Sequence, residues 1–112
     1  MGDPVGEREF FELVRLRPGM YVERPGFLTL AVYVEGYMGH AGRHGDSVFA
    51  GWRGWLADRL GHSHNLAWPL LVVRIAFPGS VGGPWDLAPE DDAKAVETMF
   101  SLLDEFLTER ET

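Results

Sequence analysis

The sequence predicts an all-α fold, a compact single-domain bundle of about five helices formed by residues 1–112. Three observations support this prediction. Apolar residues recur at three- and four-residue steps in most segments, which is the spacing of helices with one buried side. Glycine and proline interrupt this pattern at places suited to helix ends, and no repeat or linker divides the chain. We expect helices over residues 6–17, 25–45, 46–60, 66–77 and 89–109.

The segment 25–45 is the centre of the predicted fold because two of its sides differ in chemistry. One side repeats apolar residues and should be buried: Phe27, Leu30, Ala31, Val34, Met38 and Ala41. Since a helix advances about 100° per residue, a second stripe beside the first carries phenol and imidazole groups. Its members are Tyr33, Tyr37, His40 and His44. Such a stripe can bind a ligand or titrate near neutral pH.

The first and last helices have clear boundary signals. In the segment 6–17, Pro18-Gly19 ends the helix because proline cannot continue the hydrogen-bond ladder. One side of that segment holds Phe10, Leu13, Val14 and Arg17. In the segment 89–109, Pro89 fits the first turn and the acidic residues after it complement the helix dipole. We expect Leu103 and Phe106 to be among the most buried residues of its stripe, which comprises Val96, Met99, Phe100, Leu103, Phe106 and Leu107.

The two middle helices are predicted from caps and apolar content. In the segment 46–60, Asp46 or Ser47 is the expected N-cap and Gly61 suits the left-handed position after a helix. Its predicted stripe is Phe49, Trp52, Leu56 and Leu60. The segment 66–77 also allows a strand through its two adjacent valines, but its 12 residues are long for a strand. We therefore predict a buried helix there, with Pro69 tolerated in its first turn.

Composition and charge restrict the partners of the chain. Asp and Glu number 17 against 10 Lys and Arg, so the net charge of −7 disfavours nucleic acid and favours a cationic partner. No cysteine is present, which excludes disulfides and thiolate zinc sites. No apolar run reaches the roughly 20 residues of a membrane span, and no signal peptide is evident, so we predict a cytoplasmic protein. Four tryptophans are many for one small core, which predicts a homodimer.

The histidine and tyrosine side chains of the central segment are the first candidates for chemistry. His40 and His44 are four residues apart on a helix, a spacing that can hold a metal ion. We predict no metal site, because the pair lacks the intervening Glu of metalloproteases and such pairs are common on solvated helix ends. Tyr33, Tyr37 and His40 are better suited to ligand binding or acid–base chemistry. The alternative is that both tyrosines only border the core.

A resemblance covers most of the chain. Its ordered motifs are RPGMYV, LxxYVEGY, GWRGWLADRLG, NLAWPLLV and LLDEFL. This order resembles a group of small actinobacterial helical proteins, and the size and acidity are similar to the lysinoalanine-forming proteins of cinnamycin- and duramycin-type lanthipeptide pathways. The resemblance implies an enzyme that joins a lysine amine to dehydroalanine within a modified peptide. It also implies that no cofactor is used and that a hydroxy-aspartate of the substrate serves as the base.

The expected site lies around the turn near Gly45, if the helices on either side of residues 62–65 pack antiparallel. The catalytic candidates are Tyr37, His40 and Arg53, placed near the charge that develops on the substrate carbonyl. The substrate-binding candidates are Tyr21, Tyr33, Glu35, His44, Asp46 and Trp52, with Glu35 either solvated or paired with an arginine. The competing function is a non-enzymatic acidic protein that binds a basic partner, of the toxin-immunity or adaptor type.

Overall fold

The computed structural model describes residues 4–42, 48–61, 66–79 and 82–111. These ranges contain helices and no strand, so the prediction of an all-α bundle is confirmed. The α-helices are α1 (Pro4–Leu16), α2 (Phe27–Gly42), α3 (Trp52–Leu60), α4 (Trp68–Ala76) and α5 (Pro89–Arg110). Two short 3₁₀ turns, η1 (Pro18–Met20) and η2 (Pro84–Asp86), lie in the connections. None of the helices in the described ranges combines the length and the apolar content needed to cross a bilayer.

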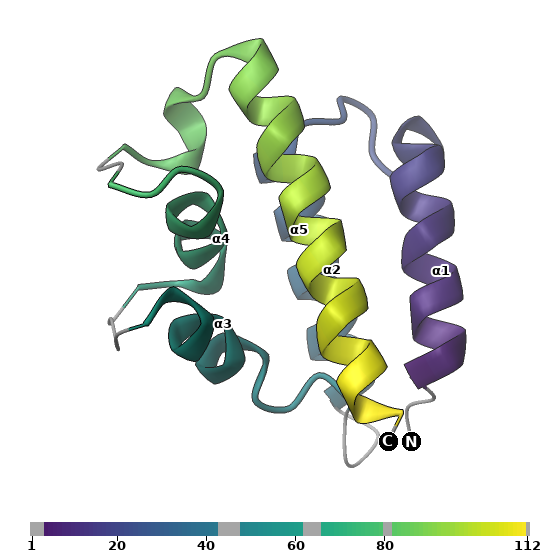
Figure 1. The fold of residues 1–112 in the computed structure, drawn as a ribbon. Coiled ribbons are helices and arrows are strands. Elements are labelled where there is room, and N and C mark those ends of the chain that lie inside the picture. The colour runs from purple at the N-terminus through teal and green to yellow at the C-terminus, as the bar shows by residue number, and fades with distance from the viewer. Residues whose placement is uncertain (1–3, 43–47, 62–65, 80–81, 112) are drawn as a thin grey trace.

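Helix α5 lies at the centre of the bundle (Figure 1). Helix α1 runs antiparallel to it on one side, and α2 lies behind it. Helices α3 and α4 pack against each other on the opposite side, and α4 also contacts α5. The start of α1 and the end of α5 therefore lie at the same end of the molecule, where Arg8 bonds to Glu111 just after α5.

The core surrounds α5, as its apolar stripe predicts. Leu103 is 0% exposed and Phe106 is 2% exposed, which confirms that they are among the most buried residues. The segment 66–77 is a core helix rather than a strand, with Leu71 and Val72 fully buried. Burial of such side chains contributes about 1.5–3 kcal/mol each relative to exposure, so α5 and α4 supply much of the stabilisation.

The predicted buried face of α1 is wrong in one respect. Val14 is buried, but Leu13 is 57% exposed and Phe11 is buried in its place. Two successive steps of about 100° place Leu13 almost opposite Phe11 on the helix. Because α5 packs on the side of Phe11 and Val14, Leu13 faces outward.

The predicted start of the third helix is also wrong. Helix α3 begins at Trp52, and residues 48–51 form a turn in which Gly51 has a φ of 86°. Such a left-handed backbone is incompatible with continuing an α-helix, and the carbonyl of Ala50 accepts a hydrogen bond from Arg110. The cap predicted at Asp46 or Ser47 lies outside the described residues. At the other end, Gly61 has a φ of 99°, which confirms the predicted left-handed position.

The start of α2 is fixed by a side chain from α5. The backbone N–H of Phe27 donates to both carboxylate oxygens of Asp92, at 3.0 and 3.1 Å. The first N–H groups of a helix lack partners within the helix, so this carboxylate satisfies one of them and complements the positive end of the dipole. The contact sets the position of α2 relative to α5, and α2 carries four of the predicted site residues, Tyr33, Glu35, Tyr37 and His40.

Candidate functional site

A surface groove of about 390 Å³ lies between α2 and the start of α3, next to α4. We call it the aromatic groove, and its lining consists of Glu35, Met38, Gly39, Phe49, Ala50, Gly51, Trp52, Arg53, Gly54 and Trp68. Three of the sequence-predicted site residues, Glu35, Trp52 and Arg53, therefore meet at one surface. Trp68 and Phe49 were missed as site residues because the apolar stripes around them predicted core positions.

The wall of the aromatic groove is a rigid cluster of aromatic rings. Trp52 and Trp68 are buried and meet edge to face, with ring centroids 5.6 Å apart. The ring of Trp52 also stacks on that of Trp55 at 5.9 Å and meets Phe106 edge to face at 5.4 Å. Such arrangements fix the ring orientations and add to the energy gained from burial. The indole Nε1 of Trp52 is buried and has no hydrogen-bond partner within the described ranges, so an unused donor lies beside the groove.

Two charged side chains, Glu35 and Arg53, line the groove together with these rings. The Glu35 carboxylate accepts a hydrogen bond from Trp68 Nε1 at 2.6 Å. This indole takes the place of the arginine that we expected as one possible partner of Glu35. The Nε of Arg53 donates to the backbone carbonyl of Leu66 at 2.8 Å, which ties α3 to the segment before α4. The groove thus combines a carboxylate and a guanidinium group, each held by a hydrogen bond, with indole rings in its wall.

The predicted tyrosines lie together on the other flank of α2. Tyr37 stacks on Phe10 with centroids 4.8 Å apart, and its hydroxyl donates to Glu7 Oε1 at 3.1 Å. Tyr21 contacts both Phe10 and Tyr33, at 5.8 and 6.0 Å. These rings form a row that joins α1, η1 and α2.

The environment of this tyrosine row keeps the phenols protonated. Burial, together with the hydrogen bond to Glu7, raises the pKa of Tyr37 to about 12. Burial also raises the pKa of Tyr33. Tyr37 therefore acts as a hydrogen-bond donor at neutral pH, and its hydroxyl bonds to a carboxylate of α1.

The predicted catalytic set is divided between these two flanks. Arg53 lines the aromatic groove, Tyr37 belongs to the tyrosine row, and His40 is exposed near the end of α2. His44 and Asp46 lie outside the described residues. Among the residues that the structure describes, no group of three or more His, Asp or Glu side chains is arranged to hold a metal ion.

No protein-family model, no curated protein and no solved structure matches this chain. The resemblance to lysinoalanine-forming proteins accordingly rests on the order of the sequence motifs and on the size and acidity of the chain. One flank of α2 borders an open, charged aromatic groove. The other flank carries a packed row of tyrosines. The aromatic groove is the candidate functional site, because charged groups there line an open surface beside packed rings and because three of the sequence-predicted site residues meet at it.

Proposed function

We propose that the aromatic groove binds a lysine-bearing modified peptide and promotes the addition of its lysine amine to a dehydroalanine, which forms lysinoalanine. The observation that carries this proposal is the Glu35 carboxylate, held by Trp68 on the wall of an open groove that Arg53 also lines. A carboxylate beside indole rings attracts an ammonium group through charge and through cation–π contact. The net charge of −7 favours the approach of a cationic peptide.

The proposed reaction needs few protein groups. A base removes a proton from the lysine ammonium, and the freed amine bonds to the β-carbon of dehydroalanine. The electrons of the carbon–carbon double bond move to the carbonyl oxygen as an enolate, which the guanidinium of Arg53 stabilises. The removed proton then returns to the α-carbon, so the product is an isomer of the substrate. Holding both partners in one groove supplies several kcal/mol by making the addition effectively unimolecular.

Mass spectrometry after incubation with a dehydrated, lysine-containing peptide tests this function. Ring closure leaves the mass unchanged, so it is read as loss of the alkene's reaction with an added thiol. We expect Arg53→Ala to slow closure at least tenfold, which corresponds to about 1.4 kcal/mol of barrier. Glu35→Gln should weaken peptide binding, whereas Glu23→Gln, which removes an exposed carboxylate outside the groove, should not. Normal closure by all the groove variants would place the reaction elsewhere.

A second candidate function is non-enzymatic binding of a basic partner protein. It is favoured by the excess of carboxylates and by the pairing of both Arg8 and Arg15 with two carboxylates each on the α1–α5 side. A protein of this kind would form a stable complex with its partner and leave the thiol reactivity of a dehydrated peptide unchanged. Size-exclusion chromatography of the complex, run beside the crosslinking assay, distinguishes the two functions.

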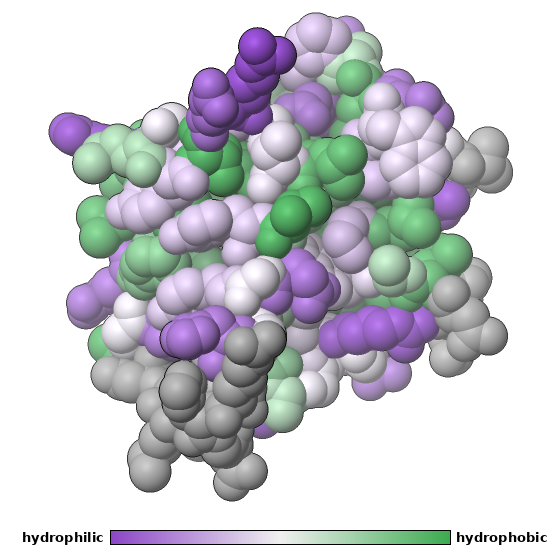
Figure 2. Space-filling view, turned by 180° about the vertical axis from the view of Figure 1, so that it is seen from behind, coloured by the Kyte–Doolittle hydropathy of each residue, from purple (hydrophilic) through white to green (hydrophobic). Residues whose placement is uncertain are grey.

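We also propose that the protein forms a homodimer through the outer face of α2. Val32 is 64% exposed there, Leu28 is exposed one turn earlier, and an added side chain at Gly36 would meet only open space. Figure 2, which views the molecule from this side, shows hydrophobic groups near the centre of the face interspersed with polar ones. Because each copy carries a net charge of −7, two copies repel each other least where their contact surface has few charged groups. Glycine in such a surface also allows two helices to approach closely. Val32→Asp should convert the dimer to a monomer in light scattering.

A further inference from the structure

We infer that the outer surface formed by α1 and α5 is a docking site for a cationic, amphipathic helix of a partner protein. This inference rests on the second candidate function and gives it a surface and a class of partner. We call the surface the acidic face. Its centre is a groove of about 550 Å³ lined by Val5, Arg8, Glu9, Glu12, Leu13 and Asp104.

The acidic face exposes an apolar stripe along α1. Val5, Leu13 and Leu16 are each about half exposed or more, and they recur at the spacing of one helix side. Val5 and Leu13 line the groove itself. Exposed aliphatic side chains in a row are uncommon on a small soluble domain unless they contact a partner. A helix that lays its own apolar side into this groove would cover them.

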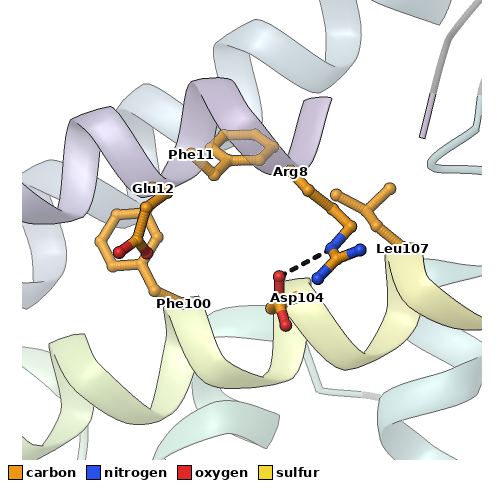
Figure 3. A pocket seen from close by; sticks show the side chains of 6 residues that line it. All are labelled: Arg8, Phe11, Glu12, Phe100, Asp104 and Leu107. Atoms are coloured by element: carbon orange, nitrogen blue, oxygen red, sulfur yellow. Dashed lines mark hydrogen bonds and ion pairs between the residues drawn. The ribbon is translucent and has the colours of Figure 1, made fainter. Parts of the chain in front are cut away.

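Carboxylates surround this stripe. Arg8 bonds to Asp104 through Nε and to Glu111 through Nη1, each at 2.8 Å. Arg15 bonds to Glu12 at 2.6 Å and to Glu97 at 3.3 Å. Figure 3 shows Arg8 reaching from α1 to Asp104 on α5 across the surface between the helices.

The balance of these charges is negative. The charged groups that line the groove, together with those linked to them directly or through Arg15 by ion pairs, comprise two guanidinium groups and five carboxylates, namely Glu9, Glu12, Glu97, Asp104 and Glu111. Each guanidinium is already held by two carboxylates, so a net charge of −3 remains for a partner. Lysine or arginine side chains flanking an apolar helix stripe would complement this arrangement.

This charge also decides between possible occupants. A second copy would bring the same acidic face, and an anionic membrane or nucleic acid would bring negative charge, so all three are repelled. Beneath the surface, the hollow between α1 and α5 holds only about 10 Å³, the size of one water molecule. A partner must therefore lie along the face rather than insert a side chain between the helices, which again favours a helix.

A synthetic peptide of about 18 residues tests the inference, built from leucine and lysine so that the leucines form one helical stripe. Fluorescence anisotropy of the labelled peptide, titrated with the full chain, measures its Kd. The double variant Leu13→Asn with Glu9→Gln should raise the Kd at least tenfold. The matched control, Met20→Asn with Glu23→Gln, likewise replaces an exposed apolar side chain and an exposed carboxylate, but outside the groove, and should alter the Kd less than twofold.

Several results would overturn the inference. One is that the peptide does not bind at low salt, and another is that both double variants lose the same amount of peptide affinity. A third is an equally large loss of affinity in Glu35→Gln, which would place the peptide in the aromatic groove. Two further results identify another occupant: binding to anionic vesicles that the Leu13 and Glu9 changes abolish, or a dimer that the same changes dissociate. Failure of the crosslinking assay leaves the peptide titration unaffected, so the two proposals fail independently.

Discussion

The indole Nε1 of Trp68 donates a hydrogen bond of 2.6 Å to the carboxylate of Glu35, and this contact joins α4 to the exposed side of α2. Trp68 is buried, whereas Glu35 is exposed. The bond therefore links the aromatic core to a charged group at the surface. It holds the carboxylate in place on the groove wall before any ligand arrives, which lowers the entropic cost of binding.

Replacing Trp68 with phenylalanine should remove this bond while keeping an aromatic ring. We expect a loss of about 1–2 kcal/mol in the free energy of unfolding, from the hydrogen bond and the smaller ring. Trp85→Phe is the matched control, since Trp85 is 68% exposed, and it should cost less than about 0.5 kcal/mol. Urea denaturation of both variants measures the difference, and equal losses would show that the bond contributes little.

The carboxylate of Asp92 should contribute more to the stability of the fold than the carboxylate of Asp91. Asp92→Ala leaves the N–H of Phe27 without its acceptor, and we expect a cost of about 1–2 kcal/mol. Asp91→Ala makes the same change in charge one residue earlier and should cost less than about 1 kcal/mol through the helix dipole alone. Thermal unfolding at low and high salt separates the two terms, because salt screens the dipole effect more than the direct bonds.

Gly51 and Gly54 should respond in opposite directions to alanine. Gly51 has a φ of 86°, and an added Cβ would lie 3.3 Å from Arg110 Nη2, so Gly51→Ala should cost about 1–2 kcal/mol. Gly54 lies within α3 with open space around it, so Gly54→Ala should stabilise by about 0.5–1 kcal/mol. Melting temperatures of the two variants are the measurement. A stabilising Gly51→Ala would contradict the left-handed turn before α3.

Phe106 should be among the residues whose truncation is most costly. It is 2% exposed and contacts the rings of both Trp52 and Trp55. Phe106→Ala should lower the free energy of unfolding by about 3–5 kcal/mol through lost burial and the cavity left behind. Ser101→Ala, at an exposed position of the same helix, is the control. A loss below about 1 kcal/mol for Phe106→Ala would mean that α5 packs differently.

Tyr37 should make the fold sensitive to alkaline pH. Its folded pKa of about 12 lies above the ordinary value of 10.0 for a tyrosine, so its contribution to stability is complete below pH 10. This contribution is lost as the pH rises through 12, because the phenolate would face the Glu7 carboxylate. Tyr37→Phe should reduce the fall in stability between these values and cost about 0.5–1.5 kcal/mol at pH 8. Identical alkaline unfolding of both proteins would contradict this assignment.

The sequence by itself determined the helical class and most helix boundaries. The apolar periodicity of α2 and α5, the proline positions in α4 and α5, and the left-handed position of Gly61 are local properties. They depend on spacing and backbone preference within a few residues, so they can be read before the fold is known. The burial of Leu103 and Phe106 followed from the same periodicity.

Only the tertiary structure decided which face of each helix meets a neighbour. The sequence prediction placed Leu13 on the buried side of α1, whereas Phe11 is buried there because of where α5 lies. The two flanks of α2 could not be separated by sequence, because Glu35 meets Trp68 and Tyr37 meets Glu7 through contacts that span 33 and 30 residues. Periodicity gives the angle of a side chain about its own helix, whereas the partner at that angle is fixed by how the helices pack.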